Sequence, residues 1–196
     1  MLTQLVNWLF PAQCGGCQRI GVGLCEHCLP PAPAIPAFTP TLRVQALGRY
    51  EGPLRAAILA LKDGRRDVGR EMGIRLAAFI EPRANVVPVP TTRLRRSTRG
   101  FDGSELLARS AAITVDLRVC TILSQIAGDA QRGRDRPARL AARGRFKAVG
   151  EISGRTFILL DDVMTTGATL EDCAATLRAS GGIVQQAIVV AVSDRP

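Results

Sequence analysis

The sequence has few aromatic residues and no long apolar run, and both absences limit what the protein can be. Aromatic side chains make up 4% of its 196 residues, with one tryptophan, one tyrosine and six phenylalanines. Extensive stacking of nucleic-acid bases needs more aromatic side chains than this. A membrane-spanning helix needs roughly 20 consecutive apolar residues, and no run approaches that length. We therefore expect no membrane span, and any DNA binding should be electrostatic and sensitive to salt.

The first ten residues also lack the features of a secretion signal. The segment MLTQLVNWLF is apolar, but no basic residue precedes its short hydrophobic stretch and no small-residue cleavage site follows it. We interpret it as a short packed helix and expect the protein to be cytoplasmic. A chain of this length can bury one α/β core and a small appendage.

Cysteine is not scarce, and four of the six cysteines have the spacing Cys14-x2-Cys17-x7-Cys25-x2-Cys28. Two CxxC pairs can bring four thiolates around one tetrahedral zinc ion, and four sulfur ligands leave no open position for a substrate. We therefore predict a structural zinc ribbon. Disulfides are the alternative, which a reducing compartment disfavours. The only histidine, His27, could replace one of the thiolates. Because four cysteines suffice to bind zinc, we expect His27 to be exposed or to contact one of the metal-binding cysteines.

Three regions are predicted along the chain. Residues 1–30 hold the N-terminal helix and the zinc ribbon, residues 31–41 form a proline-rich extended linker, and residues 42–196 form the main domain. Cys120 and Cys173 lie in this domain without partners in sequence, and we predict that both are buried in its core.

Within the main domain, apolar spacing predicts alternating strands and helices. We expect strands at residues 42–50, 85–90, 157–160 and 183–192. We expect helices at residues 53–62, 68–79, 104–112 and 169–179. Pro53 should start the first helix and Lys62 end it, and Ser104 should be the N-cap of the third.

The most informative segment is FILLDDVMTTGAT at residues 157–169, where apolar residues, two acids and a hydroxyl-glycine loop follow one another. Its apolar run predicts a buried strand of a parallel sheet, and a helix follows the loop. A strand, a tight loop and a helix commonly bind phosphate. The residues that we predict to form this cradle are Thr165, Thr166, Gly167, Ala168 and Thr169.

Each part of this segment suits one part of a sugar phosphate. Backbone N–H groups at the positive end of the helix favour a phosphate, the threonine hydroxyls add donors, and glycine allows close approach of the backbone. Asp161 and Asp162 follow the strand, where open α/β sheets bind ligands, and can accept hydrogen bonds from ribose hydroxyls. The alternative is that this segment only caps a helix, with Thr166 or Thr169 as N-cap.

Positive charge is in excess and is clustered. The net charge is +9, and 24 of the 26 basic residues are arginine. One cluster comprises Arg132, Arg134, Arg136, Arg139, Arg143 and Arg145, and a second comprises Arg93, Arg95, Arg96 and Arg99. Either cluster could attract pyrophosphate or a nucleic-acid backbone, or could simply be a solvated surface.

Residues 157–169 match the phosphoribosyl-pyrophosphate (PRPP) signature of type I phosphoribosyltransferases at all thirteen positions. Together with the cysteine ribbon, YEGPLRAAILALK at 50–62, VPVP at 87–90 and RGFD at 99–102, they resemble the ComF family, which includes ComFC and GntX-like members. The resemblance covers nearly the whole chain. It implies an α/β fold of the type I phosphoribosyltransferase kind: a Rossmann-like parallel sheet flanked by helices, with an N-terminal four-cysteine zinc ribbon.

The resemblance also implies a PRPP-binding protein associated with natural competence and the use of internalised DNA. As an enzyme it would transfer phosphoribosyl from Mg²⁺-bound PRPP to an acceptor nitrogen. Asp161 and Asp162 would be catalytic. The candidates for binding pyrophosphate or nucleic acid are Lys62, Arg95, Arg96 and Arg99.

Two alternatives to this enzyme remain. One is a non-catalytic module that senses PRPP or a nucleotide and binds single-stranded DNA, with other DNA-uptake proteins as partners. The other is a purine-salvage enzyme, although the ribbon is foreign to that group.

The chain departs from the family's Arg-Gly-Phe-Asn-Gln at Asp102 and Gly103, and an expected asparagine is Ala142. Asp102 and Asp162 are the carboxylates that could act as general base.

Overall fold

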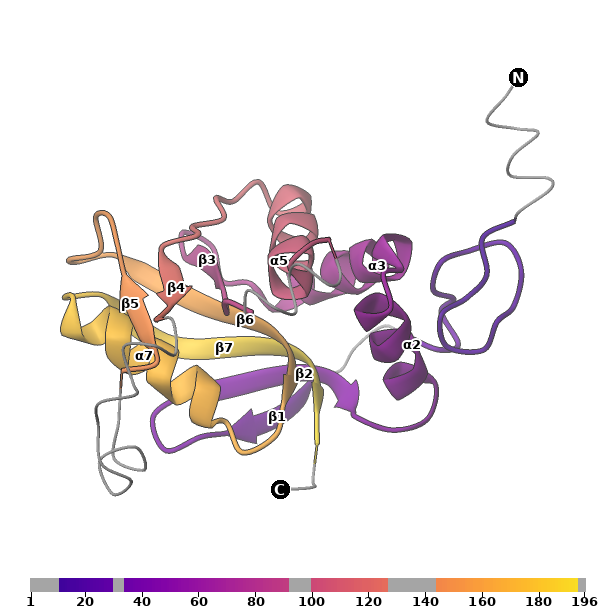
Figure 1. The fold of residues 1–196 in the computed structure, drawn as a ribbon, viewed down its shortest axis with the longest axis horizontal. Helices are drawn as coiled ribbons and strands as arrows, with labels where there is room; N and C mark the ends of the chain where they lie inside the picture. Colours follow the sequence, from indigo (N-terminus) through magenta and orange to yellow (C-terminus); the bar gives the residue numbers. More distant parts are fainter. Residues whose placement is uncertain (1–10, 30–33, 92–99, 127–143, 194–196) are drawn as a thin grey trace.

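The strands build a mostly parallel sheet, and helices connect several of them along the chain (Figure 1). The computed structural model describes residues 11–29, 34–91, 100–126 and 144–193. Their main sheet has the order β1-β2-β7-β6-β3, in which β1 is antiparallel to β2 and the other pairs are parallel. Its strands are β1 (Ile35–Phe38), β2 (Arg43–Arg49), β3 (Asn85–Pro88), β6 (Thr156–Met164) and β7 (Ile183–Val192). Strands β4 (Leu123–Gln125) and β5 (Phe146–Ala148) pair with each other in a separate two-stranded ribbon. The predicted α/β class is confirmed.

The described helices begin and end close to the predicted positions. They are α2 (Gly52–Lys62), α3 (Arg66–Leu76), α5 (Gly103–Thr114) and α7 (Ala168–Ala179), and the 3-10 helix η1 (Ala77–Phe79) continues α3. Pro53 lies in the first turn of α2, where a backbone N–H has no partner within the helix. None of the helices in the described ranges is long and apolar enough to cross a membrane.

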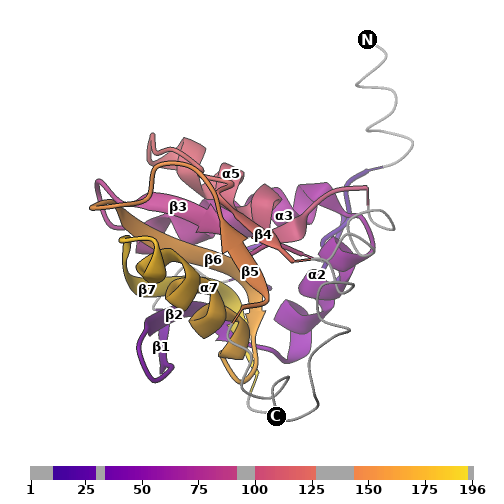
Figure 2. The same cartoon turned by 60° about the vertical axis from the view of Figure 1, so that its left-hand side comes forward.

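Successive residues of the central strands point to opposite faces of the sheet, and both faces are buried. Ile158 and Leu160 of β6 pack on the side of α2, α3 and α5, whereas Phe157 and Leu159 pack on the side of α7 and the β4–β5 ribbon. Figure 2 shows α7 across the sheet from α3 and α5. Burial on both faces explains why β6 and β7 are almost continuously apolar.

Part of the predicted proline-rich linker is built into the sheet. Within residues 31–41, β1 pairs with β2 from Ile35 opposite Ala46 to Phe38 opposite Arg43. Pro36 is tolerated because β1 is an edge strand, where one side of the backbone needs no partner. The predicted N-terminal helix and residues 30–33 lie outside the described residues.

Of the two cysteines predicted to be core residues, only Cys173 is fully buried. Cys120 is partly exposed, and its Sγ lies 3.7 Å from Asn85 Oδ1 and 3.8 Å from Arg155 Nη2. The prediction for Cys120 is confirmed only in part: it packs against the core, but it is not fully buried because the segment after α5 runs along the edge of the sheet, where Val119 bridges Val86 of β3.

The carboxyl ends of β2, β7, β6 and β3 lie along one edge of the sheet because these strands are parallel. The connections that leave this edge diverge, since α2 follows β2 on one face and α7 follows β6 on the other. In open α/β sheets such a divergence leaves a crevice in which ligands bind. The residues at this edge are therefore the candidates for a ligand-binding site.

Candidate functional site

A cavity of about 560 Å³ opens at the carboxyl edge of the sheet. Five residues of the segment 157–169 line it, namely Val163 and the four predicted site residues Asp161, Asp162, Thr165 and Thr169. Lys62, the last residue of α2, lines it as well. The fold thus brings together five of the predicted site residues. Arg95, Arg96 and Arg99, the other predicted cations, lie outside the described residues.

The loop between β6 and α7 has a backbone that only glycine adopts easily. Gly167 has φ of 75° and is the N-cap of α7, and a Cβ there would collide with the side chain of Thr39. Thr166 and Thr169 are therefore not the N-cap, contrary to the helix-cap alternative. Thr166 Oγ1 accepts a hydrogen bond of 3.4 Å from Ala168 N. Thr166, Gly167 and Ala168 shape the turn and are not among the cavity-lining residues.

A turn between β1 and β2, residues 39–41, supports this loop, and we call it the support turn. Thr41 N and Oγ1 donate to the carboxylate of Glu171 at 2.8 and 2.7 Å, and Thr39 Oγ1 donates to the same carboxylate. Although burial acts to raise it, these hydrogen bonds lower the pKa of Glu171. Glu171 lies in the first turn of α7, where a negative charge is favourable.

Glu171→Ala is expected to destabilise the protein by about 2 kcal/mol, because it leaves the donors of the support turn without their charged acceptor. Urea denaturation followed by circular dichroism measures this change. Glu71→Ala removes an exposed acid from α3 and should change stability by less than about 0.5 kcal/mol. Equal denaturation midpoints for Glu171→Ala and wild type would show that the support turn does not stabilise the fold.

Asp161 is held by two hydrogen bonds to one of its oxygens. Ser104 Oγ and the backbone N–H of Asp162 both donate to Asp161 Oδ1 at 2.8 Å. Burial raises the pKa of Asp161 to about 7, and the charges of Asp162 and Asp102 add to this effect despite the two hydrogen bonds. Near neutral pH this carboxyl group is therefore present in both protonated and ionised forms.

Asp102, and not Ser104, is the N-cap of α5. Its carboxylate accepts hydrogen bonds of 3.2 Å from Glu105 N and Thr91 N. The predicted N-cap at Ser104 is wrong because Ser104 lies inside the first turn, where its hydroxyl reaches Asp161 instead. Asp102 is buried and already bonded to two backbone donors, so Asp162 is the more accessible of the two candidate bases.

Lys62 faces the second carboxylate of the pair. Its Nζ lies 3.3 Å from Asp162 Oδ2 and 5.9 Å from the centre of the Tyr50 ring. The guanidinium of Arg55 lies 5.8 Å from the centre of the same ring. Lys62 is therefore placed to neutralise an anionic group that approaches Asp162.

Sequence reasoning missed several residues that line this cavity, among them Tyr50, Ser104, Gln125 and Arg145. Tyr50 directly follows β2, so the rule that ligands bind at carboxyl ends of strands could have identified it. Arg145 belongs to the first basic cluster, but nothing in the sequence shows that it lies here. Gln125 has no sequence signal, because the short β4–β5 ribbon that carries it leaves no clear apolar pattern.

The four predicted metal ligands converge beside α2 and α3. The Sγ atoms of Cys14, Cys17, Cys25 and Cys28 all lie within 4.8 Å of one another, and Cys14 Sγ lies 3.6 Å from Cys25 Sγ. Sulfur ligands of a tetrahedral zinc ion lie roughly 3.8 Å apart, given zinc–sulfur bonds of about 2.3 Å. The cluster can therefore bind a metal such as zinc. The cysteines form no disulfides, and His27 is exposed and not part of the group.

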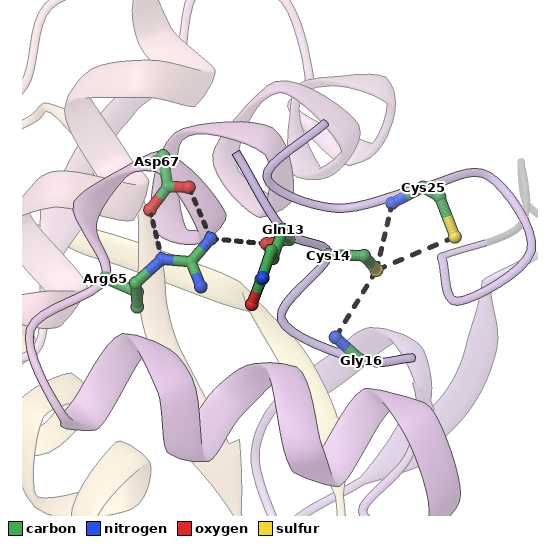
Figure 3. A network of polar contacts seen from close by, with 6 residues as sticks. All are labelled: Gln13, Cys14, Gly16, Cys25, Arg65 and Asp67. Carbon is green, nitrogen blue, oxygen red and sulfur yellow. Dashed lines mark hydrogen bonds and ion pairs between the residues drawn. The ribbon is translucent and has the colours of Figure 1, made fainter. Parts of the chain in front are cut away.

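Backbone N–H groups favour a thiolate at Cys14 (Figure 3). Cys25 N donates to Cys14 Sγ at 3.3 Å and Gly16 N at 3.4 Å. Although burial acts to raise it, hydrogen bonds from the backbone of Cys17, Cys25 and Gly16 lower the pKa of Cys14 to about 6. Burial and the neighbouring thiols raise the pKa of Cys28. A bound cation would allow all four to be thiolates at neutral pH.

The cysteine cluster packs against α2 and α3 and does not stand apart from the main domain (Figure 1). Gly15 lies against Val68, where a Cβ would meet the valine methyl carbon at 2.8 Å. Arg65 binds Asp67 through Nε at 2.9 Å and Nη2 at 2.6 Å, and Nη2 also donates to Gln13 O at 2.5 Å (Figure 3). Because α2 also carries Lys62, the cluster and the cavity share one helix.

Comparison with known proteins gives a distant similarity over the full length. No family model matches the chain. The DNA utilization protein YhgH of Salmonella typhimurium is 26% identical over 211 aligned residues, and the protein of the same name from Salmonella typhi is 27% identical over 214. Each match covers 95% of this chain and 91% of the relative. The chain is thus distantly similar, from end to end, to proteins named for DNA utilization.

Proposed function

We propose that the protein binds PRPP in the cavity at the carboxyl edge of the sheet and transfers its phosphoribosyl group to an acceptor nitrogen. Thr165, Thr169 and the turn through Gly167 would bind the 5′-phosphate. Asp161 and Asp162 would bind the ribose hydroxyls. Lys62 would face the pyrophosphate.

The observation that carries this proposal is the convergence of two carboxylates and two threonine hydroxyls from one short segment on a single cavity. A volume of about 560 Å³ is typical of sites for small ligands. The left-handed backbone at Gly167 and the N-terminus of α7 supply an end that suits an anion. A segment that only capped a helix would not need two carboxylates beside that end.

The side chains suit a substitution at the anomeric carbon of ribose. The acceptor nitrogen would form a bond to this carbon while the carbon–oxygen bond to pyrophosphate breaks, and pyrophosphate would leave with the electron pair. Asp161 and Asp162 would stabilise the positive charge that develops on the ribose, and Lys62 would stabilise the leaving group. Magnesium bound with PRPP would supply further neutralisation of the pyrophosphate charge. The proton of the acceptor would pass to Asp162 or to water, since Asp102 already accepts two hydrogen bonds.

The names of the two similar proteins support a role in the use of DNA. We associate the proposed activity with the handling of internalised DNA during natural competence. The second candidate function is a PRPP- or nucleotide-sensing module that binds single-stranded DNA without turnover. The excess of 26 basic over 17 acidic residues favours contact with DNA in either case.

The test is calorimetric titration of the zinc-loaded protein with Mg-PRPP, beside the double variant Asp161→Asn and Asp162→Asn. We expect saturable binding by the wild type and a loss of at least about a hundredfold in the variant, because both ribose-binding carboxylates lose their charge. The control variant carries Asp116→Asn and Glu151→Gln, which remove two exposed acids that do not line the cavity.

Turnover separates the two candidate functions. Release of pyrophosphate from PRPP in the presence of nucleobase acceptors would support the transferase, whereas binding without release would support the sensing module. A folded wild-type protein that does not bind Mg-PRPP would overturn the transferase and the sensing of PRPP, and would leave a nucleotide-sensing module that binds single-stranded DNA.

A further inference from the structure

Arg145 reaches the cavity from the β4–β5 ribbon. It is the residue before β5, its backbone oxygen accepts a hydrogen bond of 2.9 Å from Ile126 N, and the next residue, Phe146, is buried. Arg145 lines the same cavity as Thr165 and Thr169. The backbone at Arg145 is therefore anchored, while its side chain faces the candidate ligand site.

Asp172 of α7 holds the guanidinium in place. Arg145 Nε lies 2.6 Å from Asp172 Oδ2, and the side chain of Asp172 is only 19% exposed. Asp172 lies three residues after Thr169, so both side chains are on the same side of α7. This tether places the guanidinium beside the phosphate-binding end of the cavity.

The tether leaves the terminal nitrogens of Arg145 open to a ligand. Only Nε bonds to Asp172, and within the described residues neither terminal nitrogen has a hydrogen bond, although the guanidinium lies 5.9 Å from the centre of the Phe146 ring. The side chain as a whole is 45% exposed, which keeps it accessible from solvent. A guanidinium oriented in this way can donate two parallel hydrogen bonds to one phosphate.

We infer that Arg145, oriented by Asp172, binds the 5′-phosphate of the sugar-phosphate ligand. This inference rests on the proposed function and adds a binding residue and a positioning residue to it. Lys62 lies beside Asp162 and Tyr50, and not beside the phosphate loop. The ligand is then a sugar with anionic groups at two ends, one facing Arg145 and the other facing Lys62.

The test compares two simple probes, ribose 5-phosphate and magnesium pyrophosphate, by calorimetry. Arg145→Gln is expected to weaken binding of ribose 5-phosphate by about tenfold or more, which is the usual effect of losing a charge-assisted pair of hydrogen bonds, and to change pyrophosphate affinity by less than about twofold. Arg145→Lys should give an intermediate loss, since lysine keeps the charge without the paired donors. Asp172→Asn should give a smaller loss of about threefold, because the guanidinium is less well oriented.

Arg70→Gln is the matched control, since it removes the same charge from an exposed position on α3 that does not line the cavity. It should leave both affinities within about twofold of wild type. Equal weakening of both probes by Arg145→Gln would overturn the inference, because that result indicates a general effect of charge. Unchanged ribose 5-phosphate binding would overturn it while the proposed function stands. A wild type that binds neither probe nor Mg-PRPP would overturn the proposed function and this inference together.

Discussion

Cys14→Ser is expected to abolish zinc binding and to lower the melting temperature of the metal-loaded protein by about 10 °C. Cys14 is buried, and its sulfur accepts hydrogen bonds from Cys25 N and Gly16 N. Serine removes a thiolate ligand, and the three remaining sulfurs bind the ion too weakly to retain it. Because the cluster packs on α2 and α3, its disorder exposes apolar surface of the main domain as well.

Elemental analysis gives the zinc content, and scanning calorimetry gives the melting temperature. Cys120→Ser is the control, because Cys120 is a partly exposed cysteine outside the cluster and should leave one zinc per chain. A Cys14→Ser protein that retained its zinc would contradict the ligand set. A protein that lost zinc but kept its melting temperature would show that the cluster does not stabilise the domain.

Asp161→Asn is expected to make the unliganded protein more stable than wild type at pH 8 and equally stable at pH 4. The pKa of Asp161 is raised from 3.8 to about 7 in the folded protein. As the pH rises between these two pKa values, the unfolded chain releases a proton that the folded protein retains, so the wild type loses stability. The loss is complete above about pH 7. A shift of about three pKa units sets an upper limit of about 4 kcal/mol on this effect.

Asparagine isolates the charge because it preserves the geometry. Its Oδ1 can still accept the hydrogen bonds from Ser104 Oγ and Asp162 N. The measurement is the denaturant midpoint at several pH values, with the exposed Asp116→Asn as control. Equal midpoints for wild type and Asp161→Asn at pH 8 would show that the buried charge does not destabilise the fold. The expected result means that the candidate site keeps a charge at the expense of stability, as functional sites commonly do.

Local elements of the fold could be predicted from the sequence. The strand predicted at residues 183–192 is β7, and the helix predicted to end at Lys62 is α2. These predictions succeed because apolar periodicity and prolines act over a few residues. The cysteine cluster could be predicted for a similar reason, since four ligands within fifteen positions have few ways to be far apart.

Partners that are distant in sequence could not be predicted. Ser104 and Asp161 are 57 positions apart, and Thr41 and Glu171 are 130 apart, yet both pairs are joined by hydrogen bonds. Nothing in the sequence of residues 103–114 indicates that the Ser104 hydroxyl bonds to Asp161 of β6 and does not cap α5. Arg145 likewise has several arginine neighbours in sequence, and nothing in that cluster predicts its hydrogen bond to Asp172.

The sequence by itself determined the α/β class, the thirteen-residue segment with its carboxylates and glycine-containing loop, and the four-cysteine cluster, because each depends on residues that are close along the chain. The tertiary structure decided that Lys62, one of the predicted cations, joins them in the cavity with Ser104 and Arg145, and that α2 and α3 pack against the cysteine cluster. The physical reason is the order of the strands. With β7 between β2 and β6, and β3 beyond β6, segments far apart in sequence meet at one edge of the sheet.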